Sequence, residues 1–290
     1  MHSPPPTNRT FWITRVVFAV IAVVLSPYCY WLTTNPANTA ENFAWTLAPR
    51  FSALMFASLY LAGVYGFLRI AFGREWHRVA LLVSAILAVL AGLGVVSLLH
   101  WEKFTSDPLR IGIWSTAYLI FPPILLVLIV LNRKQDPRTP AADDVVVPAS
   151  LRRFTLILGL VFGAVGAALI LAPATMSEIW PWAMKPLAAQ SIGVLLVAPA
   201  VAQVIALRES RWSALKLVTE TGLIWFTAIL VSVVRCLAEF DRTRPATWLF
   251  FAFLIVEWGM ILWMYLSFEK ARRSRRAAGT PPADHQPVAL

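Results

Sequence analysis

Two acidic residues lie inside stretches of the sequence that are otherwise apolar, and they are the side chains best suited to carry a proton. Glu257 lies about ten residues from either end of the apolar run 247–268. At a helical rise of 1.5 Å per residue it would be roughly 15 Å deep, near the centre of a bilayer. A carboxylate there costs roughly 2.5–3.5 kcal/mol on insertion scales. We therefore expect Glu257 to face the interior of a helix bundle and to serve as a proton or cation carrier.

Glu220 is the second such acid. It lies about six residues into the apolar run 214–237 and roughly 7 Å from Glu257 in depth. The two carboxyl groups therefore form one candidate proton or cation path. The alternative is structural, because a neutral, hydrogen-bonded glutamic acid can also fix the register between neighbouring helices.

Other residues join this candidate path by the same argument from depth. Gln203 lies near one end of the run 187–207 and can line the same cavity. Pro122 and Pro123 lie in the run 111–131, at about the depth of the first acid, and each proline removes a helical hydrogen bond. Broken helices near the midplane are typical of transporter binding sites. We therefore predict that these residues share one site with the two acids.

A different cluster is expected at the outer ends of the spans, where His100, Glu102, Cys29 and Cys236 lie. A histidine with two cysteines can bind a soft metal ion, and two cysteines can form a disulfide bond if their Cα atoms lie within about 7 Å. The close ligand spacing that would support either idea is missing, so we predict no metal ion and no other cofactor. We expect His100 to pair with Glu102 or with a carbonyl group.

The signatures of soluble enzymes are missing from the sequence. The chain has no phosphate-binding Gly-Lys-Ser/Thr loop, no His-Glu-x-x-His helix, no Gly-x-Ser-x-Gly turn and no Cys-x-x-Cys pair. We therefore predict no catalytic residues, and an enzyme is the less favoured class of protein.

Composition places the chain in a bilayer. Hydrophobic residues make up 59% of the 290 residues, whereas a soluble domain has nearer to half. The net charge of +10 would suggest a nucleic-acid partner if the basic residues formed one stripe, but they lie in short clusters between apolar runs. We therefore predict the lipid bilayer, and no nucleic acid, as the partner.

Eight apolar runs have the roughly 20 residues that a helix needs to cross the hydrocarbon core. They are 11–32, 51–72, 77–100, 111–131, 153–173, 187–207, 214–237 and 247–268. The sequence thus predicts an all-α integral membrane protein with two tandem four-helix units. The predicted segments are a cytoplasmic tail 1–10, a first four-helix unit 11–131, a cytoplasmic linker 132–150, a second four-helix unit 151–268 and a basic, disordered cytoplasmic tail 269–290.

The second unit repeats landmarks of the first at an offset of about 136 residues. Trp45-x-x-x-Pro49 reappears as Trp182-x-x-x-Pro186, Trp76 as Trp212, Phe104 as Phe240 and Pro108 as Pro245. Four spans are an even number, so both units enter the membrane in the same orientation. We predict a parallel repeat whose axis runs along the membrane normal. Tryptophans near span ends, these four included, are expected to anchor the helices in the interfacial regions.

Basic residues are distributed unevenly between the two sides of the predicted spans. If the N-terminus is cytoplasmic, 18 of the 25 Lys and Arg residues lie on the cytoplasmic side and seven lie outside. This bias predicts a multi-pass protein of the plasma (cytoplasmic) membrane with both termini in the cytoplasm. The basic run 270–276 is expected to contact anionic lipid. A membrane-protein partner and a homo-oligomer are both left open.

Three functions are compatible with these features. A small-solute or proton-coupled transporter is favoured by the repeat and by the midplane Glu257. A non-catalytic membrane scaffold or assembly subunit is favoured by short loops and by stripes of small residues such as Gly159 and Gly163. A lipid-handling enzyme would use the outer cluster around His100. A cavity that reaches Glu257 would favour the first, a fully packed interior the second, and a lipid-facing groove beside His100 the third.

Overall fold

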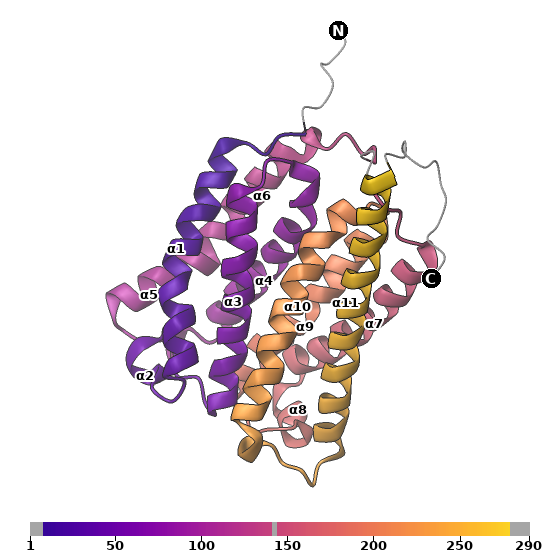
Figure 1. Ribbon diagram of the computed structural model, residues 1–290. Coiled ribbons are helices and arrows are strands. Elements are labelled where there is room, and N and C mark those ends of the chain that lie inside the picture. Colours follow the sequence, from indigo (N-terminus) through magenta and orange to yellow (C-terminus); the bar gives the residue numbers. More distant parts are fainter. Residues whose placement is uncertain (1–7, 141–143, 279–290) are drawn as a thin grey trace.

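The computed structural model describes residues 8–140 and 144–278, and within them every regular element is a helix (Figure 1). In this part of the chain, eight helical segments are long and apolar enough to cross a membrane. They are α1 (Trp12–Thr34), α3 (Arg50–Phe72), α4 (Ala80–Leu99), the composite of α5 (Pro108–Ser115) and α6 (Phe121–Asn132), α7 (Ala149–Leu171), α9 (Pro186–Ala206), α10 (Trp212–Arg235) and α11 (Pro245–Ala278). The protein is therefore an all-helical, multi-pass membrane protein, as the sequence predicts.

Short helices connect several of these segments. They are α2 (Thr39–Asn42), α8 (Pro173–Ile179) and the 3-10 turns Trp76–Arg78, Trp101–Lys103, Arg133–Gln135 and Leu237–Glu239. Proline begins several helices because its fixed φ suits the first turn. At α5 the start is also capped, since Asp107 Oδ1 accepts a 2.8 Å hydrogen bond from the Arg110 backbone N–H. Helix α1 begins and α11 ends at the same end of the bundle, which we call the terminal end (Figure 1).

The predicted tails are more ordered than expected. Helix α11 continues to Ala278, so residues 269–278 of the predicted disordered tail are helical. Near the other terminus, the Thr10 backbone N–H donates a 2.8 Å hydrogen bond to the Arg74 carbonyl, and Arg9 pairs with Glu75 as an isolated β-bridge. Residues 1–7 and 279–290 lie outside the described residues.

The predicted linker packs against the bundle at its C-terminal part. Val145 and Val147 are buried, and both lie beside the start of α10. The Val147 backbone N–H donates to the Ser210 carbonyl at 2.8 Å, and the Trp212 N–H donates to the Val145 carbonyl at 2.9 Å. Residues 144–150 of the segment that joins the two halves are therefore part of the folded structure, and Val145 and Val147 share an apolar cluster with Phe268 and Trp212.

Helix pairing follows the stripes of small residues. Helix α1 packs along α3, α7 packs along α9, and the two halves of the chain meet where α3 contacts α10 and α4 contacts α9. In the second half, α7 and α9 approach each other closely at Gly166 and Gly193. A Cβ atom built on either glycine would lie 2.6 Å from the carbonyl oxygen of the other. Only glycine allows the two backbones to come this close.

The fourth span is interrupted near its middle. A π-helical turn, Thr116–Ile120, joins α5 to α6 immediately before Pro122 and Pro123. These prolines cannot donate hydrogen bonds to the carbonyl groups four residues earlier, so the helix accommodates the loss by widening. The carbonyl oxygen of Tyr118 in this turn lies against Gly94 of α4, 2.3 Å from where a Cβ would stand. The sequence prediction of a disturbed helix at the two prolines therefore agrees with the π turn.

The four tryptophans that mark the repeat are buried in the protein. Trp45, Trp76, Trp182 and Trp212 all belong to the apolar core. The prediction that they anchor the helices in the membrane interface was wrong, because neighbouring side chains bury all four. The Trp182 ring lies 4.6 Å from that of Phe51 and the Trp212 ring 5.1 Å from that of Phe268.

Candidate functional site

A cavity of about 710 Å³ lies among the spans of both halves and is lined mainly by apolar side chains. All eight spans contribute lining residues. Its size falls in the range of sites that hold drug-sized molecules, which measure roughly 300–1,000 Å³. Its lining includes exposed residues of α1 and of α5, Val20 (57% exposed) and Leu109 (70% exposed).

Glu257 lines this cavity from the middle of α11. Its side chain is buried, with 9% of the residue exposed, and no hydrogen bond or ion pair to it is present among the described residues. An apolar cavity wall with one unpaired carboxyl group is costly unless that group is neutral or meets a cation. The geometry thus leaves Glu257 available to a proton or to a ligand.

Two antiparallel helices set the level of this acid in the bundle. Gly222 of α10 lies against Ile261 of α11, with a Cβ at Gly222 falling 3.7 Å from Ile261 Cδ1. Trp225 is about one turn from Gly222, and Glu257 is about one turn from Ile261, both towards the opposite end of the bundle. Trp225 and Glu257 therefore lie at the same level, and both line the cavity.

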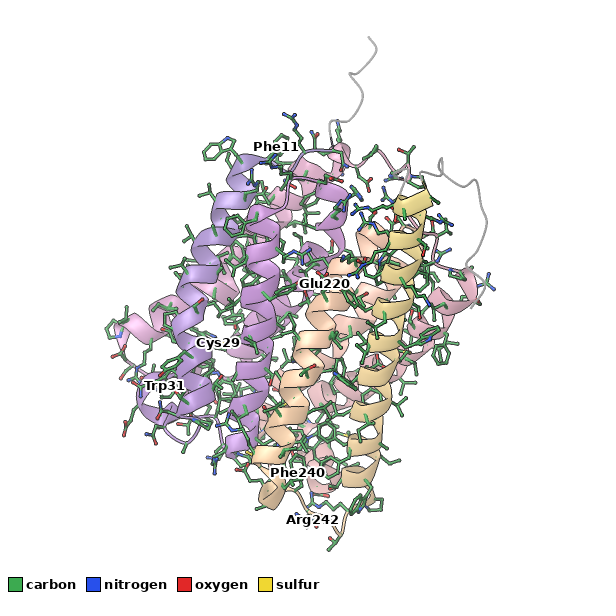
Figure 2. All side chains as sticks on the ribbon, viewed as in Figure 1. Phe11, Cys29, Trp31, Glu220, Phe240 and Arg242 are labelled. Carbon is green, nitrogen blue, oxygen red and sulfur yellow. The ribbon has the colours of Figure 1, made fainter. Side chains whose placement is uncertain are left out.

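Glu220 is engaged in an ionic cluster at the terminal end. Its Oε2 accepts 2.7 Å hydrogen bonds from Tyr65 and Arg69, and Lys216 lies 3.7 Å from its Oε1. Lys216 also contacts Glu269 at 2.8 Å. Figure 2 shows Glu220 on the part of α10 nearer the terminal end. Glu220 does not line the cavity, although its neighbours Thr219 and Thr221 do, so the predicted shared path with Glu257 is not open between the two acids.

The remaining predicted path residues divide into two groups. Gln203 lines the cavity, and its Cγ packs against Gly159, 2.9 Å from where a Cβ would stand. Pro122 and Pro123 do not line it. They act on the site indirectly, because the π turn beside them places Tyr118 in the wall, where its hydroxyl lies 3.0 Å from that of Tyr60.

The predicted outer cluster does not come together as a site. His100 Nε2 lies 2.5 Å from Gln190 Oε1, so its partner is a carbonyl oxygen, that of a side-chain amide, and not Glu102. Glu102 is exposed beside Lys103. Cys29 and Cys236 are both free and buried, and Figure 2 shows Cys29 on α1. Among the described residues, no three His, Cys, Asp or Glu side chains are grouped as a metal site requires.

Sequence reasoning missed two polar groups in the cavity wall. Trp225 Nε1 and Arg152 Nε are buried without a hydrogen-bond partner, and both residues line the cavity. Another nitrogen of Arg152 donates to the Leu207 carbonyl at the terminal end. Trp225 does stand out in the sequence as a tryptophan inside an apolar run, but nothing there indicates which way its ring faces.

A second buried polar cluster, also missed, lies at the terminal end. His77 Nε2 is 3.1 Å from Ser213 Oγ, His77 Nδ1 is 3.0 Å from Asn8 Oδ1, and Ser213 donates to Asp144. Burial lowers the pKa of His77, and the charges of Arg211 and Arg78 lower it further. The cluster joins the N-terminal segment, the linker and the starts of two spans.

Arg211 holds the neighbouring part of the linker. Its guanidinium donates to Asp136 at 2.8 and 2.9 Å and to Glu209 at 2.6 Å, while its side chain is buried. Burial raises the pKa of Asp136, but the hydrogen bonds from Arg211 and from the Arg138 backbone outweigh this effect and lower it. The carboxylate is thus held in its charged form by a bidentate pair.

Comparison of the chain with protein-family models, with curated proteins and with solved structures finds no match in any of the three. The argument for function therefore comes from the cavity and its lining residues.

Proposed function

We propose that the protein is a proton-coupled transporter of small, largely apolar solutes, with the central cavity as the binding site. The observation that carries this proposal is the unpaired, buried carboxyl group of Glu257 in the wall of a cavity of about 710 Å³. A carboxyl group in this setting can gain or lose a proton as a solute enters or leaves, which is how intramembrane acids couple the two movements.

A parallel repeat of two four-helix units is part of this proposal. Helices α3 and α9 are equivalent in such a repeat, and so are α4 and α10. The contacts α3–α10 and α4–α9 would then be one contact made twice, as a two-fold axis between the units requires. This pairing supports an axis along the membrane normal, with the cavity on it.

The proposed orientation places the terminal end in the cytoplasm of a cell with a plasma membrane. The excess of Lys and Arg among the predicted inner segments supports it. The basic residues near the end of α11 would then face the anionic inner leaflet, where each contributes roughly 1 kcal/mol of attraction near the surface.

Access to the cavity would be controlled at both ends of the bundle. At the terminal end, the ion pair between Arg69 of α3 and Glu220 of α10 bridges the two halves at 2.7 Å. At the opposite end, Phe51 packs between Trp182 and Phe240. Transport would require these contacts to open alternately. The exposed lining residues of α1 and α5 would give apolar solutes a route from the lipid.

The other two functions have less support. A scaffold would be expected to have a fully packed interior, but the cavity occupies the place where the two halves meet. A lipid-handling enzyme would need a site beside His100, yet His100 is bonded to Gln190 and does not line the cavity.

Flux measurements on vesicles test the proposal. Purified protein is reconstituted into vesicles that enclose a pH-sensitive dye at acidic pH. An aromatic quaternary ammonium, an aromatic sulfonate and an uncharged aromatic alcohol are then added separately. We expect at least one class to raise the internal pH faster in wild-type vesicles than in protein-free vesicles, and Glu257→Gln to abolish the difference. Equal rates in all vesicles with all three classes would overturn the proposal.

A further inference from the structure

We propose that the cavity takes a lipophilic organic cation, whose charged group occupies the place beside Glu257 that a proton holds when the cavity is empty. This inference rests on the proposed transport function and names the class of its substrate. The exchange is balanced in charge, because one proton leaves the carboxyl group for each singly charged cation that binds.

The charges in the cavity wall favour a cation over an anion. Among residues 8–140 and 144–278, three charged residues line it: Arg110, Arg152 and Glu257. The two arginines lie near opposite ends of the bundle, away from Glu257, and each donates to a backbone carbonyl group, although Arg152 Nε has no partner in that part of the chain. Arg110 donates to the Ala40 carbonyl at 3.0 Å, and Arg152 donates to that of Leu207. In the middle of the cavity the carboxyl group is therefore the charged group that lacks a partner, and a cation satisfies it.

The titratable groups around this acid do not supply that cation. The cavity is lined by three of the described tyrosines, Tyr28, Tyr60 and Tyr118, and a tyrosine side chain does not carry a positive charge. Of the helices that pack beside α11, α10 carries Lys216 and Glu220 towards the terminal end, and both are in the ionic cluster there. Helix α7 contacts α11 through Phe162, whose ring centroid lies 4.1 Å from that of Phe253. Arg152 lies in the first turn of α7, well over one turn before this contact.

Aromatic side chains add a second reason to expect a cation. Trp225 lies at the level of Glu257 and lines the cavity, and tryptophan is the ring that attracts cations most strongly. Its Nε1 is buried without an acceptor, so the ring is not tied to a protein group. A cation seated against the carboxyl group would have an aromatic ring beside it in the same cavity.

The apolar wall selects an organic cation over a metal ion. Calcium and magnesium ions need about six or more oxygen ligands, and among the described lining residues Glu257 alone carries a carboxylate. A molecule with an apolar body fills the volume and buries its surface against the aliphatic side chains. The ligand we expect is therefore a hydrophobic amine or a quaternary ammonium or phosphonium ion.

Two probes of the same shape and opposite charge test this inference. Binding of tetraphenylphosphonium and of tetraphenylborate is measured by equilibrium dialysis against the full-length protein in detergent micelles, with empty micelles as the blank. We expect the cation to bind and the anion not to bind above the blank. Glu257→Gln, which keeps the size of the side chain, should weaken cation binding at least about tenfold. Glu102→Gln, the same change at an exposed position, should leave it unchanged.

Proton release distinguishes the proposed exchange from simple partitioning. In weakly buffered solution, cation binding should release protons from the wild type and not from Glu257→Gln. The affinity of the wild type for the cation should rise with pH by at most about tenfold per unit.

Equal binding of both probes, or binding that the Glu257→Gln substitution leaves intact, would overturn the inference. If the sulfonate or the alcohol drives proton flux in vesicles and the cation does not bind, the substrate class is wrong but transport stands. If the cation binds and no solute drives flux, the cation site stands and transport is wrong.

Discussion

His77 Nε2 lies 3.1 Å from Ser213 Oγ, and the two residues occupy the same place in the sequence landmarks of the two halves, 136 positions apart. Each directly follows a tryptophan of the repeat, Trp76 or Trp212. Equivalent residues of two units related by a two-fold axis can touch only close to that axis. The contact therefore supports the proposed repeat, whose axis would pass between the starts of α4 and α10 at the terminal end.

Stability should depend on pH through His77. Burial lowers its pKa from the usual value of 6.5, so the folded protein binds a proton less readily than the unfolded chain. The stabilisation is complete above about pH 6.5 and is lost as the pH falls through the lower folded value. We expect the midpoint of thermal unfolding in detergent to fall with pH in this range, and His77→Gln to reduce the dependence. An identical pH profile in the variant would contradict this assignment.

The ion pair between Arg69 and Glu220 should restrict access to the cavity from the terminal end. The test uses a background in which Cys29 and Cys236 are replaced by alanine, with Thr219→Cys as the reporter in the cavity wall. We expect Arg69→Ala to raise the rate at which a membrane-impermeant methanethiosulfonate labels the reporter several-fold. Because Arg69 is 46% exposed, the loss of stability should be at most about 1 kcal/mol. An unchanged labelling rate would show that this pair does not close the cavity.

The contact between α7 and α9 should not tolerate a larger residue. In Gly193→Ala the new methyl group would meet the Gly166 carbonyl oxygen, so we expect a loss of about 1–3 kcal/mol in the free energy of unfolding. Gly259→Ala is the matched control, because a Cβ there has no atom within 4 Å. It should be neutral or stabilising by up to about 1 kcal/mol, as helix propensity predicts. Unfolding in a graded denaturant series measures both.

Tryptophans should differ in importance according to burial. Trp182→Ala removes a fully buried ring that contacts Phe51 and Phe240, and we expect a loss of about 3–5 kcal/mol. Trp12→Ala removes a ring that is 69% exposed, and its effect should stay within about 0.5 kcal/mol. Equal losses in the two variants would mean that Trp182 is less tightly packed than its contacts indicate.

The sequence was sufficient to predict the spans and the interruption of the fourth span. Eight apolar runs correspond to the eight long helical segments, because length and hydropathy are local properties of the chain. The interruption of the fourth span could be predicted from Pro122 and Pro123 for the same reason, because a proline removes a hydrogen bond from the helix that contains it.

Properties that depend on contacts between distant segments could not be predicted. Trp45 and Trp182 lie at span ends, as interface anchors do, but the aromatic residues that enclose them come from other parts of the chain. Glu220 resembles Glu257 in sequence, yet Arg69 neutralises it across 151 positions. The cluster of Asn8, His77, Asp144 and Ser213 has no local pattern at all.

Helix α11 is a single rod of about 50 Å at helical rise, longer than the roughly 30 Å of hydrocarbon. Its far part carries Arg275, which donates a 2.6 Å hydrogen bond to the Asp144 carbonyl in the segment joining the two halves. If a ligand beside Glu257 were to tilt α11, the tilt would also move Arg275 and pull on the buried segment at Asp144. The single helix thus couples the acid in the cavity to the segment between the two halves.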